Sequence, residues 1–202
     1  MAKVTTELSM SLDGYIAHPD DTVDHIFDWY ESGDVEVVVP HGDETMTFHV
    51  SESDAKHIRE SFANCGALIT GRRLFDITNG WSGRHPVDAP VFVVTHRNVP
   101  QDWIAEHPDA PFTFVTDGIQ TAVEQAKATA GDKNVSVAGP NVIQQCINLG
   151  LMDEICVSLV PVLVGEGIPF FGKLVKAPVT LEGPRIVEGE GVTHLFYTVS
   201  KD

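Results

Sequence analysis

Short apolar runs alternate with stretches of helical spacing through the middle of the chain. Each run is bounded by glycine, proline or polar residues, a pattern that predicts a buried strand. The runs are Ala67–Thr70, Val91–Thr95, Phe112–Val115, Val135–Ala138 and Glu154–Val160. Between them, apolar residues recur every three or four positions, most clearly at Ile119, Ala122, Val123, Ala126 and Ala130 before Gly131. Strands that alternate with helices predict a parallel sheet covered by helices on both faces.

The two ends of the chain predict strands of another kind. Lys3–Met10 alternates loosely and predicts a strand that ends at the Asp13-Gly14 turn. Val179–Ser200 predicts two antiparallel strands around the sequence "EGEG". We therefore expect a mixed sheet, and the length of 202 residues fits a single domain over residues 1–202.

The region between the first strand and the alternating part is less regular. Helical spacing of apolar residues predicts a helix over Ser53–Phe62, with Ser51 or Ser53 as its N-cap. We expect another short helix over Thr22–Tyr30. The stretch "PHGDETMTFHVSESD", which begins at Pro40, is polar, so we expect an irregular excursion over a pocket or an interface.

Composition narrows the class of protein. Hydrophobic residues make up 43% of the chain and charged residues 21%, as in soluble globular proteins. The formal net charge of −16 repels phosphate backbones, which makes nucleic acid a poor partner. The chain carries neither an apolar run of membrane-spanning length nor a signal-peptide pattern. We therefore expect no membrane partner and a location in the cytoplasm.

Cysteine and histidine follow none of the common metal-binding spacings. Cys65, Cys146 and Cys156 form no CxxC pair, and the nine histidines form no HExxH or HxH pattern. An odd, scattered cysteine count predicts reduced thiols in the core. On these spacings no metal site is expected.

Basic residues are unevenly distributed. Four of the six arginines, Arg72, Arg73, Arg84 and Arg97, fall within 26 residues. In so acidic a chain this cluster could attract a small anion. The alternative is a solvated face with scattered salt bridges, since charge runs usually lie on the surface.

Three predicted strands end in sequences that suit an anion. They continue into Gly71-Arg72-Arg73, His96-Arg97 and Gly139-Pro140-Asn141. Proline suits the first helical position, and glycine lets a ligand approach the backbone closely. The free N–H groups of Asn141 and Val142 would then form a phosphate cradle at a helix start. The alternative for each glycine is a tight turn.

Five motifs together resemble the dihydrofolate-reductase-like family. They are "SLDGYIA" (Ser11–Ala17), "GRRLFD" (Gly71–Asp76), "VFVVTHR" (Val91–Arg97), "VAGPNVIQQCINLGLMDEI" (Val137–Ile155) and "VPVLVGEGIPFF" (Val160–Phe171). The set is most similar to the reductase domain of bifunctional riboflavin-biosynthesis deaminase-reductases. The resemblance implies a three-layer α/β fold around a mostly parallel sheet and a C-terminal antiparallel hairpin. It also implies NADPH as the cofactor, a pterin-like or pyrimidine-like substrate and a homodimer.

The resemblance also implies positions for the cofactor. Gly71 and Arg72 would meet its phosphates, and Gly139 with Pro140, Asn141 and Val142 would hold the pyrophosphate. The adenosine ribose and its 2′-phosphate would meet Thr95, His96 and Arg97. Asp13 would lie beside the nicotinamide and the substrate.

Hydride transfer needs placement and, for some substrates, a proton donor. Asp13 is one candidate acid, although Asp-Gly is also a common turn pair. Asp54 is another, near the position of the pocket acid of dihydrofolate reductases. The alternative, which the pattern favours, is a carboxylate stabilised by a helix N-terminus. Candidate substrate contacts are Trp81, Arg84 and His85, although a tryptophan is more often packing and a loop histidine more often surface.

The function expected from these features is NADPH-dependent reduction of a small heterocycle. A riboflavin-pathway pyrimidine of the 5-amino-6-(5-phosphoribosylamino)uracil type is the first candidate substrate. The alternatives are a dihydrofolate or pterin reductase and a nicotinamide-nucleotide-binding module without turnover. We also expect a homodimer, because the apolar run Ile155–Val164 is more than a lone edge strand should expose.

Overall fold

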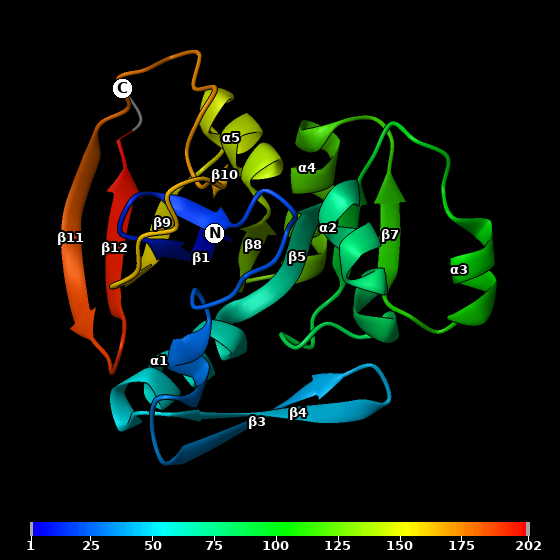
Figure 1. Ribbon diagram of the computed structural model, residues 1–202. Coiled ribbons are helices and arrows are strands. Elements are labelled where there is room, and N and C mark those ends of the chain that lie inside the picture. Colours follow the sequence, from blue (N-terminus) through cyan, green and yellow to red (C-terminus); the bar gives the residue numbers. More distant parts are fainter. Residues whose placement is uncertain (1, 201–202) are drawn as a thin grey trace.

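An eight-stranded mixed sheet divides the molecule into two sides (Figure 1). The computed structural model describes residues 2–200. The strand order is β11-β12-β9-β1-β8-β5-β6-β7, and the strands from β9 to β7 run parallel. Their bounds are β1 Val4–Ser11, β5 Cys65–Gly71, β6 Val91–Val94, β7 Phe112–Val115, β8 Asn134–Ala138, β9 Glu154–Val160, β11 Leu181–Glu188 and β12 Thr193–Val199. This confirms the predicted mixed sheet and its C-terminal antiparallel hairpin.

Helices cover both faces of the sheet, which makes three layers (Figure 1). One face packs against α4 (Ile119–Ala130) and α5 (Pro140–Asn148) in the largest hydrophobic core. The other face carries α1 (Glu52–Asn64), α2 (Arg72–Ile77) and α3 (Gln101–Glu106), with the 3₁₀ turns η1 (Asp28–Glu31) and η2 (Asn79–Gly83). Among the described residues no helix is long and apolar enough to cross a membrane.

The pleat of the central strands explains why one face differs chemically from the other. In β1, Leu8 and Met10 point into the core under α4 and α5, so Glu7 and Ser9 point to the opposite face. In β9, Cys156 and Ser158 stand directly opposite Glu7 and Ser9. The face covered by α1 therefore carries polar side chains in the middle of the sheet, although its strands are largely buried.

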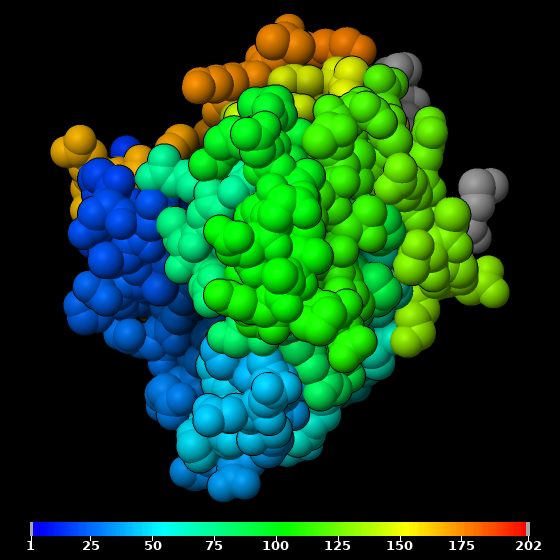
Figure 2. Space-filling view, turned by 90° about the vertical axis from the view of Figure 1, so that its right-hand side faces the viewer, coloured from blue at the N-terminus to red at the C-terminus, as the bar shows by residue number. Residues whose placement is uncertain are grey.

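The structure corrects two predictions for the irregular region. Residues 22–30 form turns and the start of η1, so the predicted helix over Thr22–Tyr30 is wrong. The stretch beginning at Pro40 is not irregular, because it belongs to a regular hairpin of β3 (Val35–His41) and β4 (Glu44–Val50). Phe48 and Val50 alternate with polar residues, and this inward face packs with Trp29 against α1. Figure 2 shows the hairpin at the lower end of its face, below α3.

The strand β9 lies in the interior of the sheet, between β12 and β1. Residues 155–160 of the apolar run are therefore covered by neighbouring strands, so β9 is not an exposed edge that a dimer would have to cover. Position in the sheet, which the apolar pattern does not reveal, decides this point. The open edge beside β12 is β11, whose residues are nearly all exposed.

Two short strands tie together the loops beyond β1 and β9. They are β2 (Tyr15–Ala17) and β10 (Ile168–Pro169), and the sequence pattern did not reveal either. Phe170, directly after β10, is fully buried, whereas Phe171 stacks on it and is 36% exposed.

Candidate functional site

The three strand ends predicted to suit an anion lie side by side. β8, β5 and β6 are consecutive in the sheet, with Thr70 opposite Ala138 and Gly71 opposite Val94. Adjacent strands are about 4.8 Å apart, so Gly139, Gly71 and Thr95 span about 10 Å along one edge. The sequence therefore located this edge correctly, and its ligand remains a prediction.

The start of α5 is open toward this edge. Gly139 is the N-cap with φ +96°, Pro140 is the first helical residue, and within the described chain no side chain caps this end. A Cβ on Gly139 would meet only Leu74 and Val142 side-chain atoms, at 3.8 and 3.9 Å. The N–H groups of the first turn thus face space that a ligand can enter.

Gly71 is a glycine that neither its backbone nor its packing requires. Its φ of −87° suits any residue, and a Cβ would meet only Val142 Cγ1 at 3.6 Å. Beside it, the hydroxyl of fully buried Thr70 finds no hydrogen-bond partner among the described residues. An unpartnered buried hydroxyl is costly, so a ligand group is a natural partner. Threonine is an ordinary strand-forming residue, so its role at this edge could not be predicted from the sequence.

Two of the four clustered arginines converge at this edge. Asp76 pairs with Arg72 at 2.6 Å and with Arg97 at 2.8 Å, and Arg72 also donates to the carbonyl of Asn98. Thr95 Oγ1 accepts a hydrogen bond from the Arg97 N–H and holds the turn after β6. The three charged groups carry a net positive charge, which suits an anionic ligand. The side chain of His96, which lies between Thr95 and Arg97 in the sequence, is exposed.

The other two arginines form separate surface pairs. Arg73 binds Asp21 at 2.6 Å, and Arg84 binds Asp88 at 2.8 Å. Both interpretations of the arginine cluster therefore hold in part. Two arginines lie at the strand ends, where they could attract an anion, and two form ordinary surface salt bridges.

Asp13 uses its carboxylate to tie two loops together. Its Oδ1 accepts from Ser11 Oγ at 2.6 Å and from the Val164 N–H at 3.1 Å, and its Oδ2 accepts from the Gly165 N–H at 2.7 Å. The Ser11 hydrogen bond, with these backbone bonds, holds the pKa of Asp13 below its usual value. These contacts are typical of a turn residue, and a catalytic role for Asp13 stays a prediction.

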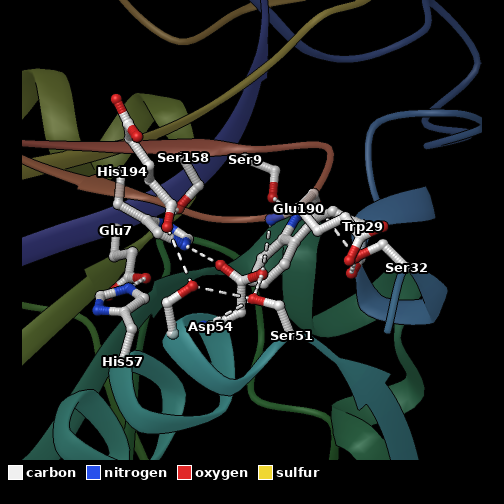
Figure 3. Close-up of polar contacts among 12 residues, drawn as sticks. Glu7, Ser9, Trp29, Ser32, Ser51, Asp54, His57, Ser158, Glu190 and His194 are labelled. Atoms are coloured by element: carbon white, nitrogen blue, oxygen red, sulfur yellow. Dashed lines mark hydrogen bonds and ion pairs between the residues drawn. The ribbon is translucent and has the colours of Figure 1, made fainter. Parts of the chain in front are cut away.

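Asp54 is fully buried. Its carboxylate lies among Ser51, Glu190 and His194 (Figure 3). Asp54 is the third residue of α1, whose N-cap Ser51 exchanges two hydrogen bonds with it. Its Oδ1 lies 3.0 Å from His194 Nε2, and its Oδ2 accepts from the Glu190 N–H at 3.0 Å. Gly189 packs so closely on the carboxylate that a Cβ there would overlap it. The turn between β11 and β12 thus closes this position.

A second carboxylate–histidine pair lies next to Asp54 and His194 (Figure 3). His57 Nε2 and Glu7 Oε1 are 2.5 Å apart, and the rings of His57 and His194 have centroids 4.1 Å apart. Burial opposes the charge of Glu7, yet its bonds to His57 and Ser61 hold its pKa below the usual value. Burial also lowers the pKa of His194. The sequence contained one signal for these pairs, which is the alternation of polar with apolar residues in β1 and β9.

The candidate substrate contacts Trp81, Arg84 and His85 lie in a different place. The Gly42 N–H at the tip of the β3–β4 hairpin donates to the Arg84 carbonyl, whereas Asp54 follows the other end of β4. Seven strand residues separate these ends, which is about 20 Å. Trp81 packs edge-on against His85, and burial with the nearby His41 lowers the pKa of His85 to about 3. A neutral imidazole makes a poor phosphate partner. The length of β4 keeps these three residues out of any pocket that contains Asp54.

With this geometry in view, a protein-family model for the RibD C-terminal domain matches residues 2–192. The chain belongs to the RibD C-terminal domain family. This is a family of reductase domains, as the ordered motifs indicated. The "Uncharacterized protein YyaP" of Bacillus subtilis (strain 168) is 26% identical over 171 residues, which cover 84% of this chain and 80% of YyaP.

Solved structures share the fold of this RibD C-terminal domain. A putative riboflavin biosynthesis protein from Shewanella sp. PV-4 aligns over 100% of both chains with a TM-score of 0.69 and 21% identity. A dihydrofolate reductase from Enterococcus faecalis, complexed with NADP(H), aligns over 98% of this chain and 97% of its own with a TM-score of 0.56 and 13% identity. The dihydrofolate-reductase-like fold is therefore confirmed.

Proposed function

We propose that this chain is an NADPH-dependent reductase of a small heterocycle. The observation that carries the proposal is the edge where an uncapped helix start, an unpartnered buried hydroxyl and two guanidinium groups come together. These groups suit the phosphates and hydroxyls of a dinucleotide. When bound, NADPH supplies the hydride from its nicotinamide ring.

Each group at the edge has a distinct proposed task. The first turn of α5, after Gly139, binds the pyrophosphate through backbone N–H groups. Arg97 binds the 2′-phosphate, and Asp76 holds Arg97 and Arg72 in position from behind. Thr70 donates its hydroxyl proton to an oxygen of the cofactor.

A riboflavin-pathway pyrimidine, of the 5-amino-6-(5-phosphoribosylamino)uracil type, is our first candidate substrate. Membership of the RibD C-terminal domain family supports it. A pterin needs a carboxylate that faces the pocket, and Asp54 is already engaged with Ser51, His194 and the Glu190 N–H. The pterin alternative is therefore the weaker of the two.

We propose that water supplies the proton that reduction requires. Asp13 stays ionised because its hydrogen bonds lower its pKa, and Asp54 is buried away from the strand ends. The protein's contribution is then to align hydride donor and acceptor and to exclude bulk water. The same two observations also favour the alternative of a nucleotide-binding module without turnover.

One assay separates these possibilities. NADPH absorbance is followed with phosphoribosylated pyrimidines, pterins and small carbonyl compounds, while NADPH binding is measured directly. We expect oxidation with a pyrimidine. Oxidation with pterins alone would replace the substrate, and tight binding with no oxidation across the panel would leave a binding module.

Arg97→Ala tests the cofactor. A charge-assisted hydrogen bond contributes about 1.5–3 kcal/mol, so we expect about a tenfold to hundredfold loss of NADPH affinity. NADH affinity should change little, because it has no 2′-phosphate. Arg73→Ala, which breaks a surface pair with Asp21, is the matched control. Equal binding of both cofactors by the unaltered protein would refute the assignment.

A further inference from the structure

Four side chains that can bind a metal meet beneath α1. They come from four different elements, and we call them the buried cluster: Glu7 of β1, His57 of α1, Cys156 of β9 and His194 of β12. Each offers one ligand atom, and these atoms all lie within 4.8 Å of one another. No other set of three or more such residues gathers like this in residues 2–200.

Sheet register explains why residues so distant in sequence converge. Glu7 and Phe196 both stand opposite Cys156, on its two neighbouring strands. His194 precedes Phe196 by two positions and therefore points to the same face of the sheet. α1 lies over this face and presents His57 to Glu7 (Figure 3). The cluster is thus built by rigid elements rather than by loops.

Burial and chemistry set this cluster apart from ordinary surface groups. His194 is 0% exposed, Cys156 6% and His57 8%, and only Glu7 is partly accessible. Two imidazoles, a thiol and a carboxylate are the donor set preferred by zinc and related divalent ions. We propose a divalent metal site beneath α1, with zinc as the best match, whose ligands are Glu7, His57, Cys156 and His194.

The ligands already have the supporting contacts that metal sites use. Ser61 Oγ donates to Glu7 Oε2 at 2.8 Å. The ring of His194 lies between Asp54 Oδ1 at 3.0 Å and Ser158 Oγ at 2.8 Å. His194 Nδ1 exchanges Ser158 for the metal, while Nε2 keeps its hydrogen bond to Asp54. A carboxylate or hydroxyl on the far side of a ligating histidine orients the ring and raises its basicity.

A route for the ion is also present. A cavity of about 470 Å³ is lined by Glu7, His57 and Cys156 on its inner side. Glu60, Glu154 and Glu182 line it as well, and their charges attract cations. Arg185 is a basic residue of the lining, and its guanidinium stacks on Phe196, 3.7 Å from the ring centroid. The cavity therefore connects the cluster to an acidic surface.

Metal binding requires a modest rearrangement. Tetrahedral zinc holds its ligand atoms about 3.4–3.8 Å apart, so the widest pair in the cluster must close by about 1 Å. The thiol of Cys156 gives up a proton to solvent when it binds the metal. The hydrogen bond between His57 and Glu7 is broken, because both side chains become ligands. With four protein ligands the site is structural, and it fixes α1 to the sheet. The metal-site proposal does not depend on the cofactor site proposed at the ends of β8, β5 and β6.

The test uses the full chain after removal of metals with a chelator. Zn²⁺ is titrated calorimetrically, and Co²⁺ is added as a spectroscopic probe of a tetrahedral thiolate site. We expect stoichiometric binding, thiolate-to-cobalt charge transfer with intense visible bands, and a higher thermal midpoint with Zn²⁺. Weak, non-stoichiometric binding without the cobalt spectrum would overturn the proposal and leave two hydrogen-bonded carboxylate–histidine pairs.

Variants identify the ligands. Cys156→Ser should abolish the charge-transfer band, whereas Cys146→Ser should keep it, because Cys146 is buried in the core under α5 instead. Asp54→Asn should weaken metal binding by about 10- to 100-fold, the usual effect of losing a carboxylate behind a ligand. Circular dichroism checks that each variant folds. If Cys156→Ser does not fold, Glu7→Gln with a weakened cobalt spectrum serves in its place. A cobalt spectrum that persists in both Cys156→Ser and Glu7→Gln would refute the assigned ligands.

Discussion

Glycine has two physical roles in this chain, and the space around each residue separates them. Gly189 packs on the carboxylate of Asp54, so the protein itself excludes a side chain there. Gly71 has an ordinary backbone conformation and open space around its missing side chain. The fold does not need a glycine at this position, which lies next to the unpartnered Thr70 hydroxyl, and this supports our proposal that a ligand approaches there.

Gly71→Val tests that role directly. We expect NADPH affinity to fall at least about tenfold, because the branched side chain fills the space at the strand end. The thermal midpoint should stay near that of the unaltered protein. Fluorescence titration and thermal melting measure the two quantities, and Gly172→Val is the control, since a Cβ there meets only atoms at 3.9 Å. Unchanged NADPH binding would make Gly71 a simple turn residue.

Gly189→Ala should lower the stability of the protein, which Gly71→Val should leave unchanged. Its methyl group would overlap the Asp54 carboxylate, and overpacking of this kind costs about 1–3 kcal/mol. Urea unfolding should show this loss, while Gly172→Ala should lie close to the unaltered protein. Equal stability of the two variants would mean that the turn between β11 and β12 shifts freely and does not seal Asp54.

Elements with a single strong period were predictable, and those defined by partners were not. α4 carries a continuous apolar stripe and ends before Gly131, as predicted, and α5 begins at Pro140, as predicted. The hairpin of β3 and β4 was missed because its inward residues pack against α1, which sequence spacing does not show. The position of β9 inside the sheet was missed for the same reason, since strand order depends on contacts between distant residues.

If the chain forms a dimer, the exposed edge strand β11 is the place where the two copies would meet. Eight residues of this edge strand are largely exposed, among them Leu181 at 36% and Ile186 at 55%. The unpaired backbone groups of an edge strand can pair with another strand. We propose that a second copy of the chain covers β11, and we expect a dimer in sedimentation experiments at micromolar concentration. Ile186→Lys should shift it toward monomer, whereas a monomer in the unaltered protein would refute the proposal.

At the scale of the whole molecule, an acidic chain gathers positive charge at one edge of its sheet. The chain carries a net charge of −16, yet the edge formed by β8, β5 and β6 gathers two arginines around one aspartate. The sequence predicted this edge because strand ends and glycines are local signals. The buried cluster was not predictable, because its four residues share no spacing and meet only through sheet register and the docking of α1.

Two histidines with lowered pKa values should make the stability of the protein sensitive to acid. Burial lowers the pKa of His194, and with His41 it lowers that of His85 to about 3. Below about pH 6.5 the unfolded chain binds protons that the folded chain does not, so stability falls as pH falls. Glu7, whose pKa is also lowered, adds to the loss at more acidic pH, when its carboxylate is protonated.

The measurement is the free energy of unfolding between pH 7 and pH 4, with a chelator present. His85→Gln should flatten the slope, by at most about 1.4 kcal/mol per pH unit. His25→Gln is the control of opposite sign: its exposed ring has a pKa raised by Asp28, so its loss should leave the slope unchanged or slightly steeper. A slope that His85→Gln does not alter would mean that His85 is accessible to protons.

The contacts around Asp54 also determine when the protein can finish folding. Its partner His194 lies 140 positions later in the chain, and Ser53 binds the Glu188 carbonyl 135 positions later. During synthesis on a ribosome, α1 is made long before these residues exist. The polar residues of α1 that face the sheet therefore stay in contact with water until β12 has been synthesised. Contacts of such long range slow folding, so α1 should acquire protection from proteases only after the last strand of the sheet has been made.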